Sequence, residues 1–169
     1  TPTAIRVGTG RGAANGILIK SAESLGVAHA IDAVVLEKTG TVTEGKPVVT
    51  DVLAVAADEN ELLAVAASLE KMSGHPLADP IVAEAESRGV ALKVAKDYEL
   101  IHGQGIVGTV DGARCAAGNR ALMAAEGVDI TNQTAYEERL AEAGKTPLYF
   151  AKGGALLGII DVADVAPDS

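Results

Sequence analysis

The 169-residue chain is poor in aromatic side chains and in cysteine. It has no tryptophan, one phenylalanine and three tyrosines, so stacking platforms for single-stranded nucleic acid are not available in number. Its single cysteine, Cys115, excludes an internal disulfide and a multi-cysteine metal site. These absences predict a core of aliphatic side chains and fit a reducing, cytosolic setting.

Basic clusters and long apolar runs are also missing. Lys and Arg number 14 against 23 Asp and Glu, a net charge of −9, with no Lys/Arg-rich stripe. Nucleic acid and anionic membrane surfaces are therefore not expected as partners. No apolar run approaches the roughly 18 to 20 residues that a membrane-spanning helix needs, and the first residues lack the apolar stretch of a signal peptide. With 48% hydrophobic residues, the composition is that of a globular domain.

Glycine and proline divide the first half of the chain into short elements. Apolar runs at 17–20 and 33–36 predict strands, the second of them buried. Between them, Ser21 can cap a helix that runs to about residue 30. A strand over 47–56 precedes two helices, one starting after Asp58 and ending near residue 72 and one ending near residue 88. Pro80 places the start of the second helix either at residue 76 or, with residue 79 as its cap, at Pro80 itself.

From residue 98 the pattern changes to antiparallel β structure. Asp111-Gly112 and Gly153-Gly154 predict tight turns of two hairpins. Two helices lie between the hairpins, one opened by Asn119 as its cap and one over 132–143. We therefore expect an α/β fragment that carries an antiparallel α+β domain.

The string EKTGT at residues 37–41 suits phosphoryl chemistry. Backbone N–H groups of the turn and the hydroxyls of Thr39 and Thr41 can hold phosphate oxygens, and the carboxylate of Glu37 can act as a nucleophile or a Mg²⁺ ligand. Taken alone, these residues are also compatible with a solvated turn after a strand.

Two further strings could contribute to a binding site. Glu70 ends one predicted helix and His75 begins the next, although a surface connection between helices would also explain them. The string HGQGIVG at 102–108 matches GxGxxG in letters, but a strand follows it and not a helix, so a dinucleotide site is rejected. Gly103 and Gly105 instead allow a close backbone approach to a flat ligand, or mark a strand bulge.

Taken in order, these strings resemble the cytosolic ATP-binding region of the heavy-metal-transporting P-type ATPases. EKTGTVTEGKP is similar to the family's DKTGT phosphorylation motif, LEKMSGHPLA to its His-Pro motif with an upstream Glu, and HGQGIVG and GNRALM to its Gly-x-Gly and Gly-Asn signatures. The opening TPTAIRVGTGRGAANGILIK resembles the segment after the metal-carrying transmembrane helix and is closer to the copper and silver exporters than to the zinc and cadmium ones. The closing GIIDVADVAPDS resembles the return into the phosphorylation domain, so the resemblance covers essentially the whole chain.

The resemblance implies a layout in three segments. Residues 1–44 would begin a phosphorylation (P) domain of the haloacid-dehalogenase type, which is incomplete here. Residues 45–155 would form the nucleotide-binding (N) domain, an antiparallel sheet flanked by helices, and 156–169 would return to the P domain. The chain would be a cytoplasmic domain of an integral protein of the cell membrane. Its partners would be the remainder of that ATPase, namely the P domain, the actuator domain and the membrane helices, and the isolated chain is expected to be monomeric.

The resemblance also implies the role of each site residue. ATP or ADP would be the ligand, with His75 stacking on adenine and Glu70 accepting a hydrogen bond near the exocyclic amine. Gly103 and Gly105 would give the ring a close, flat backbone approach. Asn119 would complete the pocket or hold its loop.

At the phosphate end, the family has an aspartate where this chain has Glu37. ATP would phosphorylate this position, beside Lys38, Thr39 and Thr41, and the cycle would drive metal export by the parent protein. Mg²⁺ would be held mostly by P-domain residues that this chain lacks, and no metal site is expected within it. A misplacement of about 1 Å can cost about 100-fold in rate, so the longer glutamate predicts ATP binding without turnover.

Two other hypotheses come from different classes of protein. A haloacid-dehalogenase-type phosphohydrolase would share the acid at the end of a strand, but it needs an Asp nucleophile and a second acidic cluster downstream, and the chain shows neither. A non-catalytic interaction domain would bind its partner independently of nucleotide.

Overall fold

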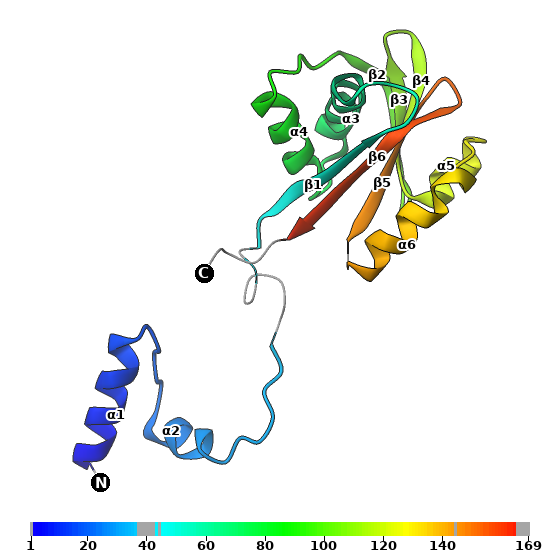
Figure 1. Cartoon of the computed structure of the whole chain (residues 1–169). Helices are drawn as coiled ribbons and strands as arrows, with labels where there is room; N and C mark the ends of the chain where they lie inside the picture. Colours follow the sequence, from blue (N-terminus) through cyan, green and yellow to red (C-terminus); the bar gives the residue numbers. More distant parts are fainter. Residues whose placement is uncertain (1, 37–42, 44, 144, 165–169) are drawn as a thin grey trace. The chain divides into compact units, whose positions relative to one another are not determined.

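The structure is a computed structural model that describes residues 2–36, 43, 45–143 and 145–164 (Figure 1). The chain divides into two units, Thr1–Glu37 and Lys38–Ser169. The first unit contains the helices α1 (Pro2–Ala14) and α2 (Ala22–Ala28). Ser21 caps α2 as predicted, because its hydroxyl accepts a hydrogen bond from the Ser24 N–H at 3.1 Å.

The two strands predicted within the first unit are wrong. Residues 17–20 and 33–36 have no regular structure, and the side chains of Val34 and Val35 are 75% and 96% exposed. A strand is stabilised by pairing with a neighbour, and the described residues of this unit include no strand that could supply the pairing. The apolar runs thus indicate a tendency to form strands, but these segments form none in the structure.

The second unit is built on one six-stranded sheet with helices on both faces (Figure 1). The strand order is β1-β6-β5-β4-β3-β2 and every pairing is antiparallel, so the predicted fold class is confirmed. The strands are β1 (Pro47–Ala54), β2 (Ala95–Ile101), β3 (Gly105–Val110), β4 (Ala113–Gly118), β5 (Thr146–Lys152) and β6 (Ala155–Asp164).

Local signals in the sequence account for the turns and helix ends of this unit. Asp111 and Gly112 adopt positive φ angles of 53° and 74°, as a type I′ turn between β3 and β4 requires. The carboxylate of Asp58 accepts a hydrogen bond from the Glu61 N–H at 2.8 Å and caps α3 (Glu59–Ser73). The helix α4 (Ala78–Ser87) begins between the two predicted starts, so Pro80 lies in its first turn, where no backbone donor is needed.

The sheet separates the core into two layers, and each layer lies between one face of the sheet and the helices that cover that face. In Figure 1, α3 and α4 cover one face, and α5 (Arg120–Ala125) and α6 (Thr134–Glu142) cover the other. The short 3₁₀ helix η2 (Thr131–Gln133) precedes α6. The layer beneath α5 and α6 is centred on Leu122, Met123 and Ile159.

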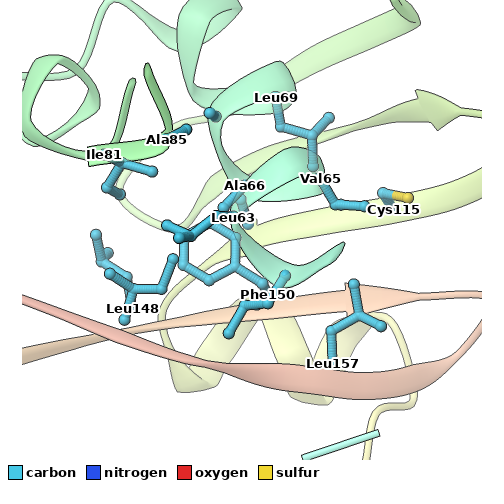
Figure 2. Packing of buried hydrophobic residues seen from close by; sticks show 14 of the residues in the cluster. Leu63, Val65, Ala66, Leu69, Ile81, Ala85, Cys115, Leu148, Phe150 and Leu157 are labelled. Atoms are coloured by element: carbon cyan, nitrogen blue, oxygen red, sulfur yellow. The ribbon is translucent and has the colours of Figure 1, made fainter. Parts of the chain in front are cut away.

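The larger core layer is centred on α3. Every residue from Leu62 to Glu70 is buried, and the leucines and valine of this stretch pack against Phe150 and Leu148 of the sheet and against α4 (Figure 2). Cys115 is 1% exposed in the same cluster, so its side chain is a packing residue of the core. The core is thus largely aliphatic, with a single phenylalanine.

The last strand extends the sheet beyond the predicted end of the N domain. β6 continues to Asp164 and pairs with β1 up to Pro47, so residues 156–164 belong to the sheet. The division of the chain into phosphorylation and nucleotide-binding segments stays a prediction.

Asp161 is a fully buried carboxyl group on β6. The hydroxyl of Tyr136 on α6 donates to its Oδ2 at 2.9 Å, whereas its Oδ1 has no hydrogen-bond partner among the described residues. Burial raises the pKa of Asp161, and the nearby negative charge of Asp51 adds to this effect, while the Tyr136 hydroxyl and the Lys145 ammonium oppose it. Keeping this side chain ionised therefore lowers the stability of the fold.

Asp161→Asn is expected to gain stability relative to the wild type as the pH rises. An acid whose pKa is raised on folding binds its proton more tightly in the folded state, so its contribution to stability falls as pH rises from the unfolded pKa, about 4, through the folded value. Asparagine does not titrate, and its carbonyl oxygen still accepts from Tyr136. Urea unfolding from pH 4 to pH 8 should show the variant-minus-wild-type difference in unfolding free energy rising.

Asp129→Asn provides a control of opposite sign. Hydrogen bonds from the Thr131 hydroxyl and N–H lower the pKa of Asp129, so the stability that this carboxylate contributes is present above the unfolded pKa and is lost as pH falls through the folded one. For Asp129→Asn the same difference should therefore fall as the pH rises toward the unfolded pKa, about 4, so its urea series extends down to about pH 2. If the difference in unfolding free energy changed in the same direction with pH for both variants, the opposite pKa shifts assigned to Asp161 and Asp129 would be contradicted.

Candidate functional site

A pocket of about 480 Å³ lies in the second unit, where the end of α3, the β2–β3 turn and the start of α5 come together. Most of its lining comes from three strings that the sequence singles out. The lining residues are 73–77, 100–106 and 117–119, together with Glu70, Thr146 and Leu148.

All five residues predicted to contact a nucleotide line this one pocket. They are Glu70, His75, Gly103, Gly105 and Asn119. The four residues predicted at the phosphate end, Glu37, Lys38, Thr39 and Thr41, lie outside the described residues. The structure thus brings the predicted adenine-contacting residues together, whereas their roles, and those of the phosphate-end residues, stay predictions.

The end of α3 supplies an acidic wall of the pocket. Glu70 lies in the last turn of the helix and is 4% exposed. The hydroxyl of Ser73 donates to Glu70 Oε2 at 2.6 Å, and the N–H of His75 donates to the Ser73 Oγ at 3.1 Å. Burial raises the pKa of Glu70, while the Ser73 hydrogen bond and the His75 imidazole oppose this shift.

The imidazole of His75 is exposed and lines the pocket. Gly74 ends α3 in the left-handed region, with φ 61°, and this reversal allows the chain to turn back toward the end of the helix. The Leu77 N–H donates to His75 Nδ1 at 3.2 Å. In a neutral ring, Nδ1 is then the acceptor and the proton is on Nε2, so both the tautomer and the ring position are constrained.

Gly105 and Gly118 form a part of the pocket with no side chains. They are partners in the β3–β4 register, and a Cβ on Gly105 would lie 2.1 Å from the Ala117 carbonyl oxygen, whereas one on Gly118 would lie 2.2 Å from that of Gln104. Glycine is thus required at both positions by the contact between the strands. A Cβ on Gly103 would meet no atom within 4 Å.

Asn119 holds the β2–β3 turn against α5. Its Oδ1 accepts from the Leu122 N–H at 3.1 Å and caps the helix, while its Nδ2 donates to the Gly103 carbonyl oxygen at 2.9 Å. Its backbone N–H donates to Gln104. These hydrogen bonds link the β2–β3 turn to the start of α5, whereas the role of Asn119 toward a nucleotide stays a prediction.

Several lining residues were not predicted from the sequence. Ser73 could have been found from its helix-end position three residues after Glu70, and His102 from its place beside Gly103. Leu100, which is 57% exposed, gave no signal in the sequence, because only the folding of the sheet brings this residue into the pocket lining.

The lining favours a flat, uncharged ring with an N–H donor. Most of the lining residues are glycine or apolar, the charged or titratable ones are Glu70, His75 and His102, and none of the described residues that line the pocket is lysine or arginine. Such a surface, with one carboxylate acceptor and one imidazole, suits a heteroaromatic ring. The described lining residues thus offer neither lysine nor arginine to a polyphosphate.

Neither a metal cluster nor a membrane helix is present in the described part of the chain. Among the residues described, no group of three or more His, Cys, Asp or Glu could hold a metal ion. In the same part of the chain, every helix is too short or too polar to cross a membrane.

Comparison with known proteins identifies the class. The family model of the haloacid dehalogenase-like hydrolases matches residues 31–168, so the chain belongs to this family. Within it, the chain is 42% identical over 170 residues to Copper-transporting ATPase 1 of Rhizobium meliloti (strain 1021), which covers 100% of this chain and 21% of that protein. The resemblance inferred from the sequence is confirmed by this match. The chain spans about a fifth of the length of the curated relatives that it matches.

Solved structures agree with this assignment. A zinc-transporting PIB-type ATPase in its E2.Pi state is similar over 77% of this chain and 21% of its own, with a TM-score of 0.69 and 32% identity. The N-domain of HMA8, a copper-transporting P-type ATPase, is similar over 69% of this chain and 99% of its own, with a TM-score of 0.58 and 28% identity.

Proposed function

We propose that this chain is the ATP-binding part of a copper-transporting P-type ATPase and that its pocket binds the adenine ring. The observation that carries the proposal is the convergence of Glu70, His75 and the Gly103–Gly105 turn on one pocket, although they come from separate segments. The similarity to copper-transporting relatives over the whole chain supports the choice of transporter.

In this proposal, each pocket residue makes one contact with adenine. Glu70 Oε2 is occupied by Ser73, so Oε1 accepts from the exocyclic amine, and the His75 ring stacks on the purine. The β2–β3 turn gives the ring a backbone surface, and Asn119 keeps that turn in place.

The proposal places the triphosphate outside the pocket, because none of the described residues that line the pocket is lysine or arginine. The phosphates would extend to the motif at residues 37–41, where Glu37 stands at the phosphorylated position. Bound Mg²⁺ would supply charge neutralisation, through residues beyond those described. The phosphorylation cycle of the whole protein would export copper across the cell membrane, with this chain on the cytoplasmic side and the other ATPase domains as its partners.

Neither alternative hypothesis accounts for this pocket. A free-standing phosphohydrolase needs catalytic carboxylates, and the described residues lining the pocket contribute only one, Glu70. An interaction domain without a ligand has no need of a deep carboxylate beside an imidazole.

ATP, ADP, AMP and adenosine are expected to bind the wild-type chain with affinities within about fivefold of one another, because the ring makes the contacts. GTP should bind at least about tenfold more weakly, since its 6-oxo group would face the Glu70 acceptor. Isothermal calorimetry measures both comparisons. Glu70→Gln should weaken ATP binding, and Glu86→Gln, an exposed change on α4, should not.

Two outcomes would contradict the proposal. Adenosine binding far more weakly than ATP would place the main contacts at the phosphates. Equal binding of ATP and GTP would remove Glu70 from recognition of the ring.

A further inference from the structure

We propose that Ser73 is a positioning residue that sets the Glu70 carboxylate and the His75 backbone in one geometry, and so determines how well the pocket recognises the 6-amino group of adenine. This inference rests on the proposed function. Ser73 would act on adenine recognition through its hydrogen bonds with Glu70 and His75.

The Ser73 hydroxyl makes three hydrogen-bond contacts at the end of α3. Its Oγ lies 2.6 Å from Glu70 Oε2 and 2.8 Å from the Glu70 carbonyl oxygen, and it accepts from the His75 N–H at 3.1 Å. A hydroxyl has one proton and two lone pairs, so the proton is shared between the two Glu70 oxygens while a lone pair is given to His75. One hydroxyl therefore links the two residues that the adenine ring would contact.

The consequence for Glu70 follows from its burial. At 4% exposure, an unpartnered carboxylate oxygen is costly, and among the described residues Ser73 is the hydrogen-bond partner of this carboxylate. With Oε2 held, the carboxylate has one orientation and presents Oε1 as a single acceptor. A single fixed acceptor distinguishes a ring that carries an N–H donor at this point from one that does not.

Ser87 is a serine at a helix end that is not among the lining residues of the pocket. It is the last residue of α4, as Ser73 is of α3, and its Oγ donates to the carbonyl oxygen of Glu84, three residues earlier, at 2.9 Å. The Glu84 carboxylate instead pairs with Arg88 at 2.6 Å. Ser87→Ala therefore removes the same helix-end hydrogen bond and leaves the pocket unchanged, which makes it the matched control.

The test compares ATP with purine riboside triphosphate, which lacks the 6-amino group. In the wild type, ATP should bind more tightly than this analogue. Ser73→Ala is expected to weaken ATP binding about tenfold and binding of the analogue about twofold, because both ligands depend on His75 but only ATP depends on the orientation of Glu70. The ratio of the two affinities should therefore fall about fivefold. Ser73→Thr, which keeps the hydroxyl, should retain most of the ratio, and Ser87→Ala should retain all of it.

The outcomes separate the two proposals. If the wild type fails to bind ATP, the proposed function is wrong. If the wild type binds ATP and Ser73→Ala weakens both ligands equally or neither of them, Ser73 does not position Glu70, while the proposed function stands. Circular dichroism checks that the variant is folded. Should it not be, Ser73→Cys, whose thiol is a weak donor, takes its place in the same comparison and must show the same fall in the ratio.

Discussion

Gly105→Ala is expected to lower the free energy of unfolding by about 4 kcal/mol and to abolish nucleotide binding. The added methyl carbon would lie 2.1 Å from the Ala117 carbonyl oxygen and 2.6 Å from the Gly118 Cα. Both are backbone atoms of the paired strand β4 and cannot rotate away. The strands would have to separate at the part of the pocket that they form, with φ at 146° adding to the strain.

Gly103→Ala is the matched control for this change. It also lies in the β2–β3 turn and lines the pocket, but its Cβ would meet nothing within 4 Å. The cost should be that of a positive φ of 70° alone, about 1 kcal/mol. Urea denaturation of both variants measures the difference, and equal losses would show that the close contact between β3 and β4 is not what requires glycine at 105.

Phe150→Ala is expected to cost about 4 kcal/mol of stability, the range for a large aromatic removed from a rigid core. Phe150 is 0% exposed and is the chain's single phenylalanine, and it lies on β5 within the cluster beneath α3 (Figure 2). No other side chain in that aliphatic cluster has a ring that could fill the space. Thermal unfolding followed by circular dichroism provides the measurement.

Tyr98→Ala tests whether this loss comes from burial. Tyr98 is a similar-sized ring on the edge strand β2 and is 47% exposed, so its removal should cost less than about 1 kcal/mol. If Phe150→Ala proved no more harmful than Tyr98→Ala, Phe150 would not be central to the core.

The parts of the fold that could be predicted from the sequence depend on neighbours within a few residues. The caps at Ser21 and Asp58 and the turn at Asp111-Gly112 each satisfy backbone groups locally, and each is observed where the sequence places it. The strands at 17–20 and 33–36 could not be decided in this way, because a strand needs a partner that local sequence does not specify. The predicted start of α4 was wrong by about two residues, because Pro80 can occupy any position in the first turn of a helix and so does not define where the helix begins.

The candidate site shows the same difference between features that local sequence predicts and features that depend on the fold. Five of its lining residues could be predicted because their motifs occur in a recognisable order, and two of these five, Glu70 and His75, are close in sequence. The reason for glycine at 105 could not, because it depends on the register that places Gly105 opposite Gly118. The positions of Leu100 and Leu148 in the pocket likewise follow from the assembly of the sheet.

The central claim is that adenine binds between the end of α3 and the β2–β3 turn, and backbone amide NMR during an ATP titration tests it most directly. Saturation at up to about 10 mM ATP should shift the amides of residues 70–75, 77, 102–106 and 117–119, and leave those of α6 in place. Unchanged amides in the three pocket segments, or shifts confined to other parts of the chain, would contradict the claim.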